Sequence, residues 1–130
     1  MSENEARKTT IRYLLEKADN ALRAAQREYS ADDLDLAINR VYYACFYAAS
    51  AVLLNEKQQF TKHSGVRAAV HMHLVKTGKL SPDMGKFYDE AFKERHEADY
   101  TLLSEFESDT TANRIKQASA FVAEMKRLLN

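Results

Sequence analysis

The sequence contains few of the residues that interrupt helices, with three Gly and one Pro among 130 residues. Gly and Pro are the least favourable residues inside an α-helix, and the chain is instead rich in Ala, Leu, Glu, Lys and Arg, which favour it. A chain of this length usually forms one domain with a sizeable core. We therefore expect a single all-α domain spanning residues 1–130.

Cysteine is almost absent, since Cys45 stands alone. A single Cys excludes an internal disulfide and indicates a reducing compartment. The first five residues, MSENE, lack the basic start and apolar core of a signal peptide. These features predict a cytoplasmic protein. Cys45 lies among apolar residues, and we interpret it as a packed small side chain, not a nucleophile.

Net charge is also absent, because nineteen Lys and Arg residues balance nineteen Asp and Glu residues. There is therefore no global field to attract nucleic acid or an anionic membrane, although local basic patches remain open. The sequence has no Gly-rich phosphate loop, GxSxG elbow or HExxH motif. Its four His do not follow metal-ligand spacing, so we expect neither a metal site nor a cofactor.

What the sequence does have is a long apolar segment from Leu34 to Leu54. A helix that is apolar almost all round is surrounded by other protein. Its uninterrupted part, residues 41–54, falls in the length range that favours a buried core helix over a membrane span. We expect the rest of the chain to pack around this helix.

Helical spacing divides this segment into three faces. The first is aliphatic and suits the core: Leu34, Ile38, Val41, Cys45, Ala49 and Val52. The second consists of small residues that let another helix approach closely, within the chain or across a dimer interface: Ala44, Ala48 and Ala51. The third carries polar tips on largely apolar bodies: Arg40, Tyr43, Tyr47 and Ser50.

Apolar periodicity predicts four further helices, over residues 2–28, about 63–76, 82 to about 102, and 110–129. We expect Ser30 or Asp32 to cap the central helix, and Thr61 or Ser64 to cap the third. Ser81, followed by Pro, is a strong start for the fourth. The predicted fold is an up-and-down antiparallel helical bundle of about five helices.

The most distinctive polar cluster is RHEADY, residues 95–100. Arg95 and Asp99 are four residues apart, so they could form an ordinary ion pair at the edge of the bundle. Arg40, inside the apolar segment, needs a carboxylate or phosphate partner, and Asp99 or Glu97 is the expected acid. Two arginines, an acid and several tyrosines on an apolar wall could equally receive a phosphate or a nucleotide.

The predicted third helix is locally basic and forms a second candidate patch, which consists of Lys62, His63, Arg67 and Lys76. Its simplest interpretation is a solvated face, and the alternative is a surface that contacts RNA. His63 stands at a helix start, where an anion can bind.

Four blocks of the chain resemble, in order and spacing, the small stand-alone proteins of the HEPN family (higher eukaryotes and prokaryotes nucleotide-binding). They are RVYYACFYAA (40–49), TKHSGV (61–66), KTGKL (76–80) and RHEADY (95–100). The resemblance implies a helical bundle that forms a homodimer around a shared cleft. It also implies a partner, a minimal nucleotidyltransferase, in a toxin–antitoxin pair.

For the ribonuclease members of this family, the resemblance implies RNA cleavage without a metal ion. The residues that it implies for this reaction are an arginine and a histidine, which follows the arginine after four to six intervening residues. The arginine would steady the phosphate and the histidine would assist proton transfer from the ribose 2′-hydroxyl. Arg95 matches the arginine, but Tyr100, Thr101 and Leu102 stand where the histidine is expected. Arg95 and Tyr100 are therefore the catalytic candidates, and the ribonuclease pattern is incomplete.

Three hypotheses follow. The first is a HEPN-type module, acting with a nucleotidyltransferase, that binds a nucleotide or RNA phosphate through Arg40, Tyr43, Tyr47, Lys62, His63 and Asp99, beside Arg95 and Tyr100. The second is a metal-independent endoribonuclease toxin with a degenerate motif. The third is a protein-interaction bundle in which the same polar residues form an internal network.

Overall fold

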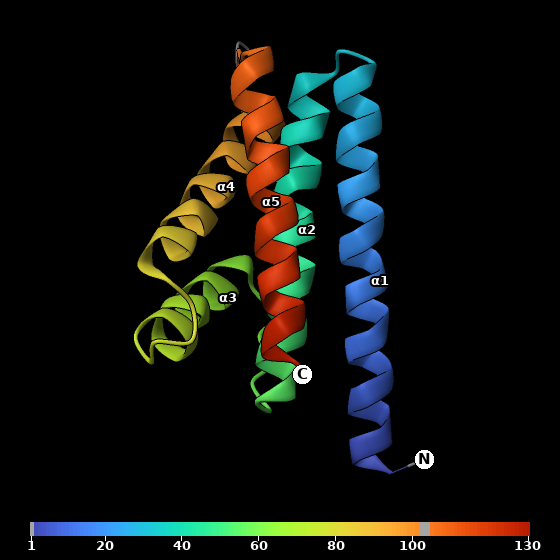
Figure 1. Ribbon diagram of the computed structural model, residues 1–130, viewed down its shortest axis with the longest axis vertical. Coiled ribbons are helices and arrows are strands. Elements are labelled where there is room, and N and C mark those ends of the chain that lie inside the picture. The colour runs from blue at the N-terminus through green and yellow to red at the C-terminus, as the bar shows by residue number, and fades with distance from the viewer. Residues whose placement is uncertain (1, 102–104) are drawn as a thin grey trace.

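The computed structural model describes residues 2–101 and 105–130, and within them all regular structure is helical (Figure 1). Five α-helices succeed one another: α1 (Glu3–Ser30), α2 (Leu34–Asn55), α3 (His63–Ala69), α4 (Pro82–Tyr100) and α5 (Ser108–Leu128). A π-helical segment, η1 (Val70–Val75), continues α3. The all-α prediction is confirmed. The helix boundaries agree with the predicted ones to within two residues wherever the structure describes both, except that α2 begins three residues later than a cap at Ser30 predicts.

Helix α2 contacts each of the other helical elements. Helices α1, α2 and α5 lie nearly parallel to one axis, whereas α4 is inclined to them and α3 with η1 lies to one side (Figure 1). The chain runs up in α1 and α4 and down in α2 and α5. The predicted up-and-down arrangement therefore describes the bundle, with α3 and η1 as a short crosswise connection.

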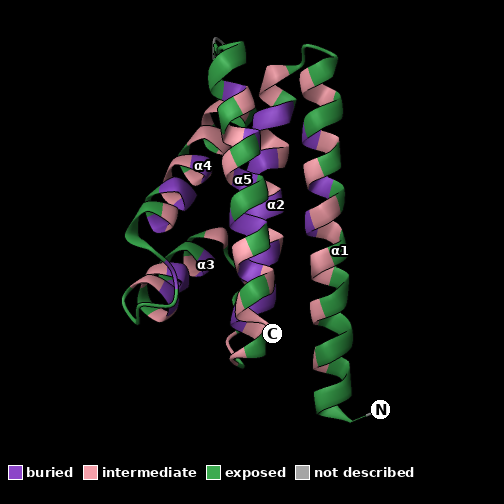
Figure 2. Ribbon diagram, viewed as in Figure 1, coloured by how far each residue is buried: buried purple, intermediate pink, exposed green. Residues whose placement is uncertain are grey.

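The core of the protein lies on α2, whose inward positions are buried along most of the helix (Figure 2). Five of the six aliphatic positions are buried as predicted, namely Ile38, Val41, Cys45, Ala49 and Val52, and Leu34 is half-buried. By length and composition α2 could cross a membrane, but 67% of its most apolar window is buried inside the protein. It is thus covered in the way that a core helix is.

The alanine face of α2 is fully buried within the chain, because Ala44, Ala48 and Ala51 each have 0% exposure. Helix α1 in turn buries alanines alone: Ala18, Ala21 and Ala25. Side chains this small let two helix backbones approach closely. Of the two expectations for this face, the contact within the chain is the one that the structure shows.

Two predicted helix caps are wrong. Helix α1 extends through Ser30, and Asp32 adopts a left-handed backbone conformation with φ 62°, so the cap of α2 is Asp33. Its carboxylate accepts a hydrogen bond of 3.2 Å from the backbone N–H of Leu36.

The start of α3 also differs from the prediction. Lys62 occupies the cap position without a side-chain hydrogen bond, since Ser64 already lies inside α3 and Thr61 precedes the cap. The Ser81 cap of α4 is confirmed, because its hydroxyl accepts from the N–H of Met84 at 3.2 Å. Leu102, the predicted end of the fourth helix, lies outside the described residues.

Helix α4 is held against α5 by the Arg114 guanidinium, which donates to carboxylates of Glu94 at 2.8 Å and Glu90 at 2.6 Å. The Arg114 side chain is 16% exposed, so this ion pair is screened less than a surface one. It fixes the half of α4 that carries Arg95.

The full burial of Ala48 in the core predicts that a larger side chain at this position is not tolerated. Replacing Ala48 by Leu should lower the free energy of unfolding by about 1–3 kcal/mol or more, because overpacking forces side chains and backbone to shift. Urea denaturation measures this loss. Ala120→Leu, on the exposed side of α5, is the matched control and should change little. Equal stability of both variants would contradict close packing at Ala48.

Candidate functional site

The candidate site lies where α2 meets α4, on the rings of two successive tyrosines. Tyr42 is fully buried and Tyr43 half-buried, and their rings meet edge to face at 5.2 Å. The Arg95 guanidinium carbon lies 5.3 Å from the centre of the Tyr42 ring, and that of Arg40 lies 4.9 Å from the Tyr43 ring. Each arginine is therefore placed over an aromatic face, an attractive cation–π geometry.

Asn39 connects the two helices at the edge of this site. Its amide nitrogen donates to both carboxylate oxygens of Asp99, at 2.9 and 3.1 Å. Its amide oxygen accepts from Nε and Nη2 of Arg40, at 2.9 and 2.7 Å. The direct pairing expected between Arg40 and Asp99 is thus replaced by a relay through Asn39, and Glu97 takes no part in it.

The guanidinium of Arg95 is recessed and uses few of its donors. Its side chain is 13% exposed, and its buried Nε–H finds no acceptor among the described residues. Its Nη1 lies 3.5 Å from the Tyr43 hydroxyl and 3.6 Å from an Asp99 oxygen, both long for a hydrogen bond. A buried charged donor without an acceptor is costly, and an anion would relieve that cost.

His63 reaches the same tyrosines from the start of α3. Its Nδ1 and the Tyr42 hydroxyl are 2.7 Å apart, and its ring packs on Phe46 with centroids 4.4 Å apart. Burial, and then the positive charge of Arg95, lower the pKa of His63 below its ordinary value of 6.5. Burial raises the pKa of Tyr42 to about 12. At neutral pH, the site therefore contains a neutral imidazole bonded to a protonated phenol.

The remaining candidates divide into two groups. Tyr100 is 68% exposed at the end of α4, and its ring centre lies 6.0 Å from the Arg95 guanidinium carbon. Tyr47 lies beside α1, with the Lys17 ammonium 5.0 Å from its ring. The Tyr47 ring also meets that of Tyr43, with centroids 5.8 Å apart. Lys62 is exposed, and its side chain makes no hydrogen bond or ion pair within the described part of the chain. The structure therefore gathers seven of the eight predicted residues: Arg40, Tyr43, Tyr47, His63, Arg95, Asp99 and Tyr100.

Sequence reasoning missed Asn39 and Tyr42, because a lone amide and a core tyrosine carry no motif of their own. It also missed a second cluster, in which one oxygen of Asp89 lies 2.8 Å both from Arg67 Nε and from His71 Nε2. These contacts hold the pKa of Asp89 below its usual range in spite of its partial burial. No group of His, Cys, Asp and Glu in the described residues is arranged to hold a metal ion.

Comparison with known proteins gives one family and several relatives. The family model described as "HEPN domain" matches residues 11–128. The "UPF0332 protein" of Thermotoga maritima is 40% identical over 119 residues, which cover 92% of this chain and 90% of that protein. "Putative toxin MJ0142" of Methanocaldococcus jannaschii is 30% identical, over 94% of this chain and 83% of its own length. "Putative toxin MJ0605" of the same organism is 30% identical, over 92% and 88%.

The proximity of His63 to Arg95 predicts a coupled titration. Because the folded state disfavours the imidazolium, the unfolded state binds more protons between the lowered pKa and 6.5, and the free energy of unfolding should fall as the pH drops through that window. NMR titration of the His ring protons should show the His63 pKa below 6.5 and shifted upward in Arg95→Gln. An unchanged His63 titration in that variant would contradict the coupling, and Arg23→Gln on α1 is the control.

Proposed function

This chain belongs to the HEPN domain family, and on that basis we propose that it is a toxin-like module that binds a nucleotide or RNA phosphate at Arg95 and Arg40. The observation that carries the proposal is the recessed Arg95 guanidinium, whose buried Nε–H has no acceptor among the described residues. Planar guanidinium groups with free N–H donors bind phosphate oxygens in a fixed, often bidentate geometry.

The charges at the site favour one anion. Two arginines face a single carboxylate, Asp99, whose oxygens already accept two hydrogen bonds from Asn39. Arg40 uses Nε and Nη2 on Asn39, so its Nη1 remains available in the described structure. A phosphate between the arginines would gain charge-assisted hydrogen bonds without displacing the Asn39–Asp99 contact.

The rest of the proposal concerns partners. Two of the relatives have "toxin" in their names, and we extend the idea to this chain as a cytoplasmic homodimer that acts with a nucleotidyltransferase. Exposed apolar side chains on α2 and on the connection that follows it, Leu36 and Phe60, provide contact area for such partners. Light scattering of the purified protein measures its mass in solution, and a monomeric mass would contradict the proposed homodimer.

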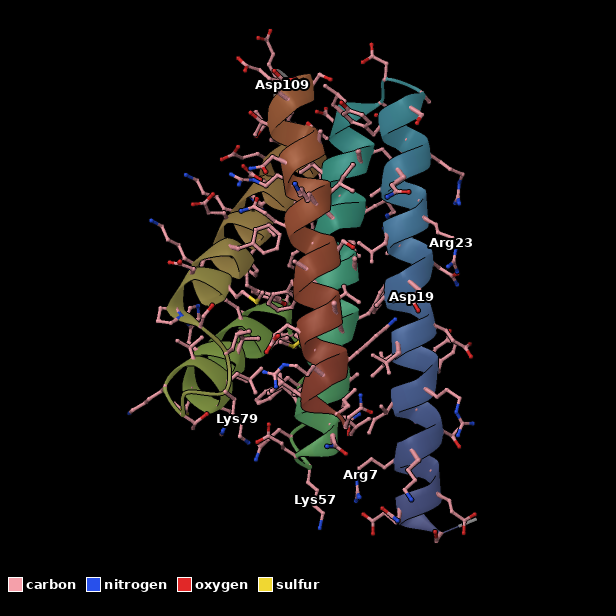
Figure 3. The ribbon with its side chains drawn as sticks, viewed as in Figure 1. Arg7, Asp19, Arg23, Lys57, Lys79 and Asp109 are labelled. Carbon is pink, nitrogen blue, oxygen red and sulfur yellow. The ribbon has the colours of Figure 1, made fainter. Side chains whose placement is uncertain are left out.

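Removing one guanidinium should weaken phosphate binding. Arg95→Gln and Arg40→Gln should each raise the Kd for a mononucleotide roughly tenfold or more, because a hydrogen bond to a charged group contributes about 1.5–3 kcal/mol. Isothermal titration calorimetry measures the change. The matched control is Arg23→Gln, since Arg23 projects outward from α1, away from the bundle (Figure 3). Absence of binding by the wild type, or equal Kd values for the Arg95 and Arg23 variants, would contradict the proposal.

A second candidate function, metal-independent RNA cleavage, is favoured by the position of His63. In the tautomer whose Nδ1–H donates to the Tyr42 oxygen, Nε2 has no hydrogen-bond partner among the described residues and can take a proton. That proton would come from a ribose 2′-hydroxyl, whose oxygen forms a new bond to phosphorus. The bond from phosphorus to the 5′-oxygen breaks at the same time, and the 5′-oxygen takes a proton from water. Arg95 would steady the phosphate.

This second function predicts cleavage that survives chelation and depends on His63. RNA incubated with the protein and EDTA should yield fragments ending in 2′,3′-cyclic phosphate, and His63→Gln should reduce the rate about a hundredfold or more, within the usual contribution of a general base. His73→Gln, on η1, serves as the control. Intact RNA at high protein concentration would eliminate this function and leave the binding proposal standing.

A further inference from the structure

The end of α4 presents two exposed aromatic rings beside the recessed arginine. Tyr100 is 68% exposed, His96 is also exposed, and their ring centroids lie 4.8 Å apart. Single exposed rings are ordinary on protein surfaces. Here, however, the Tyr100 ring centre also lies 6.0 Å from the Arg95 guanidinium carbon, so an exposed aromatic ring, tilted by 45° to that of His96, adjoins the proposed phosphate-binding group.

A groove begins at His96, one ring of this pair. His96 and Phe92 line a cavity of about 550 Å³ between α3 and α4, whose cations are Arg67, Lys86 and Lys93. Two of its three carboxylates are paired, because Asp89 accepts from Arg67 and Glu90 accepts from Arg114, and Glu97 is the third. Lys86 and Lys93 have no ion pair within the described residues. The groove therefore offers positive charge next to the aromatic pair.

From this arrangement we propose that Tyr100 and His96 form a stacking platform for an unpaired base, and that the ligand of the Arg95 site is single-stranded nucleic acid. The inference rests on the proposed function, because it takes the phosphate at Arg95 as given. One nucleotide would place its phosphate on Arg95 and its base on Tyr100, and the strand would continue past His96 into the groove. Aromatic platforms beside basic grooves are how proteins bind single strands without base pairing.

The geometry disfavours a duplex at this site. In a duplex, each base is covered on both faces by its neighbours, so no base face is available to Tyr100. The Arg95 guanidinium is also recessed behind the exposed ring, with a side chain that is 13% exposed. A flexible strand can turn its phosphate inward and its base outward, whereas a stiff duplex presents its phosphates on a convex surface. The site should therefore discriminate by strandedness and tolerate different bases.

The test is fluorescence polarisation of a short labelled RNA, alone and annealed to its complement. The wild type should bind the single strand at least tenfold more tightly than the duplex. Tyr100→Ala should weaken single-strand binding about fivefold to a hundredfold, as expected for one stacked base, and Tyr100→Phe should retain it. Tyr13→Ala removes a comparably exposed ring from α1 and should leave binding unchanged.

The outcomes separate this inference from the function on which it rests. Equal affinity for both RNA forms, or unchanged binding by Tyr100→Ala, would overturn the stacking platform while loss of binding in Arg95→Gln still supported the phosphate site. No binding of any RNA or mononucleotide by the wild type would overturn both. A Lys86→Gln, Lys93→Gln double variant should weaken binding of the strand without affecting binding of a mononucleotide. An equal loss of affinity for the two ligands would show that the strand does not bind along the groove.

Discussion

The covering of α2 is the constraint on which the rest of the structure depends. A helix that is apolar almost all round loses stability wherever it meets water, so α1, α5, α4 and α3 each cover part of it. Alanines allow α1 to approach closely on one side. On the side of α4, the cover is aromatic, because Tyr42 and Tyr43 present their ring faces to the arginines. The candidate site is thus a consequence of how α4 covers α2.

The same constraint explains why one guanidinium is left with free donors. Packing Arg95 over the Tyr42 ring buries Nε without supplying an acceptor, and Asp99 is engaged by Asn39. A network built for stability alone would supply a hydrogen-bond acceptor for a buried donor such as the Arg95 Nε–H. An incompletely satisfied arginine, with a neutral imidazole beside it, is typical of a site that awaits an anionic ligand.

Much of the fold could be predicted from the sequence, because the scarcity of Gly and Pro and the apolar periodicity act locally. The helix ends were harder to predict, since the cap of α2 depends on how far α1 continues before Asp33. Helical faces predicted that Arg40 and Asp99 belong to one cluster, but they predicted a direct pairing. The insertion of Asn39 between them, and the arrival of His63 from α3, depend on the register between separate helices, which no single periodic pattern contains.

The central claim is that an anion binds at the unsatisfied arginine. The most direct measurement is an NMR titration of the arginine Nε–H signals with a mononucleotide. The account predicts a large, saturable shift of the Arg95 signal and a smaller one for Arg40, with Arg114, already paired to two glutamates, and Arg23 unmoved. Shifts confined to exposed arginines such as Arg23, or no saturable shift at Arg95, would contradict it.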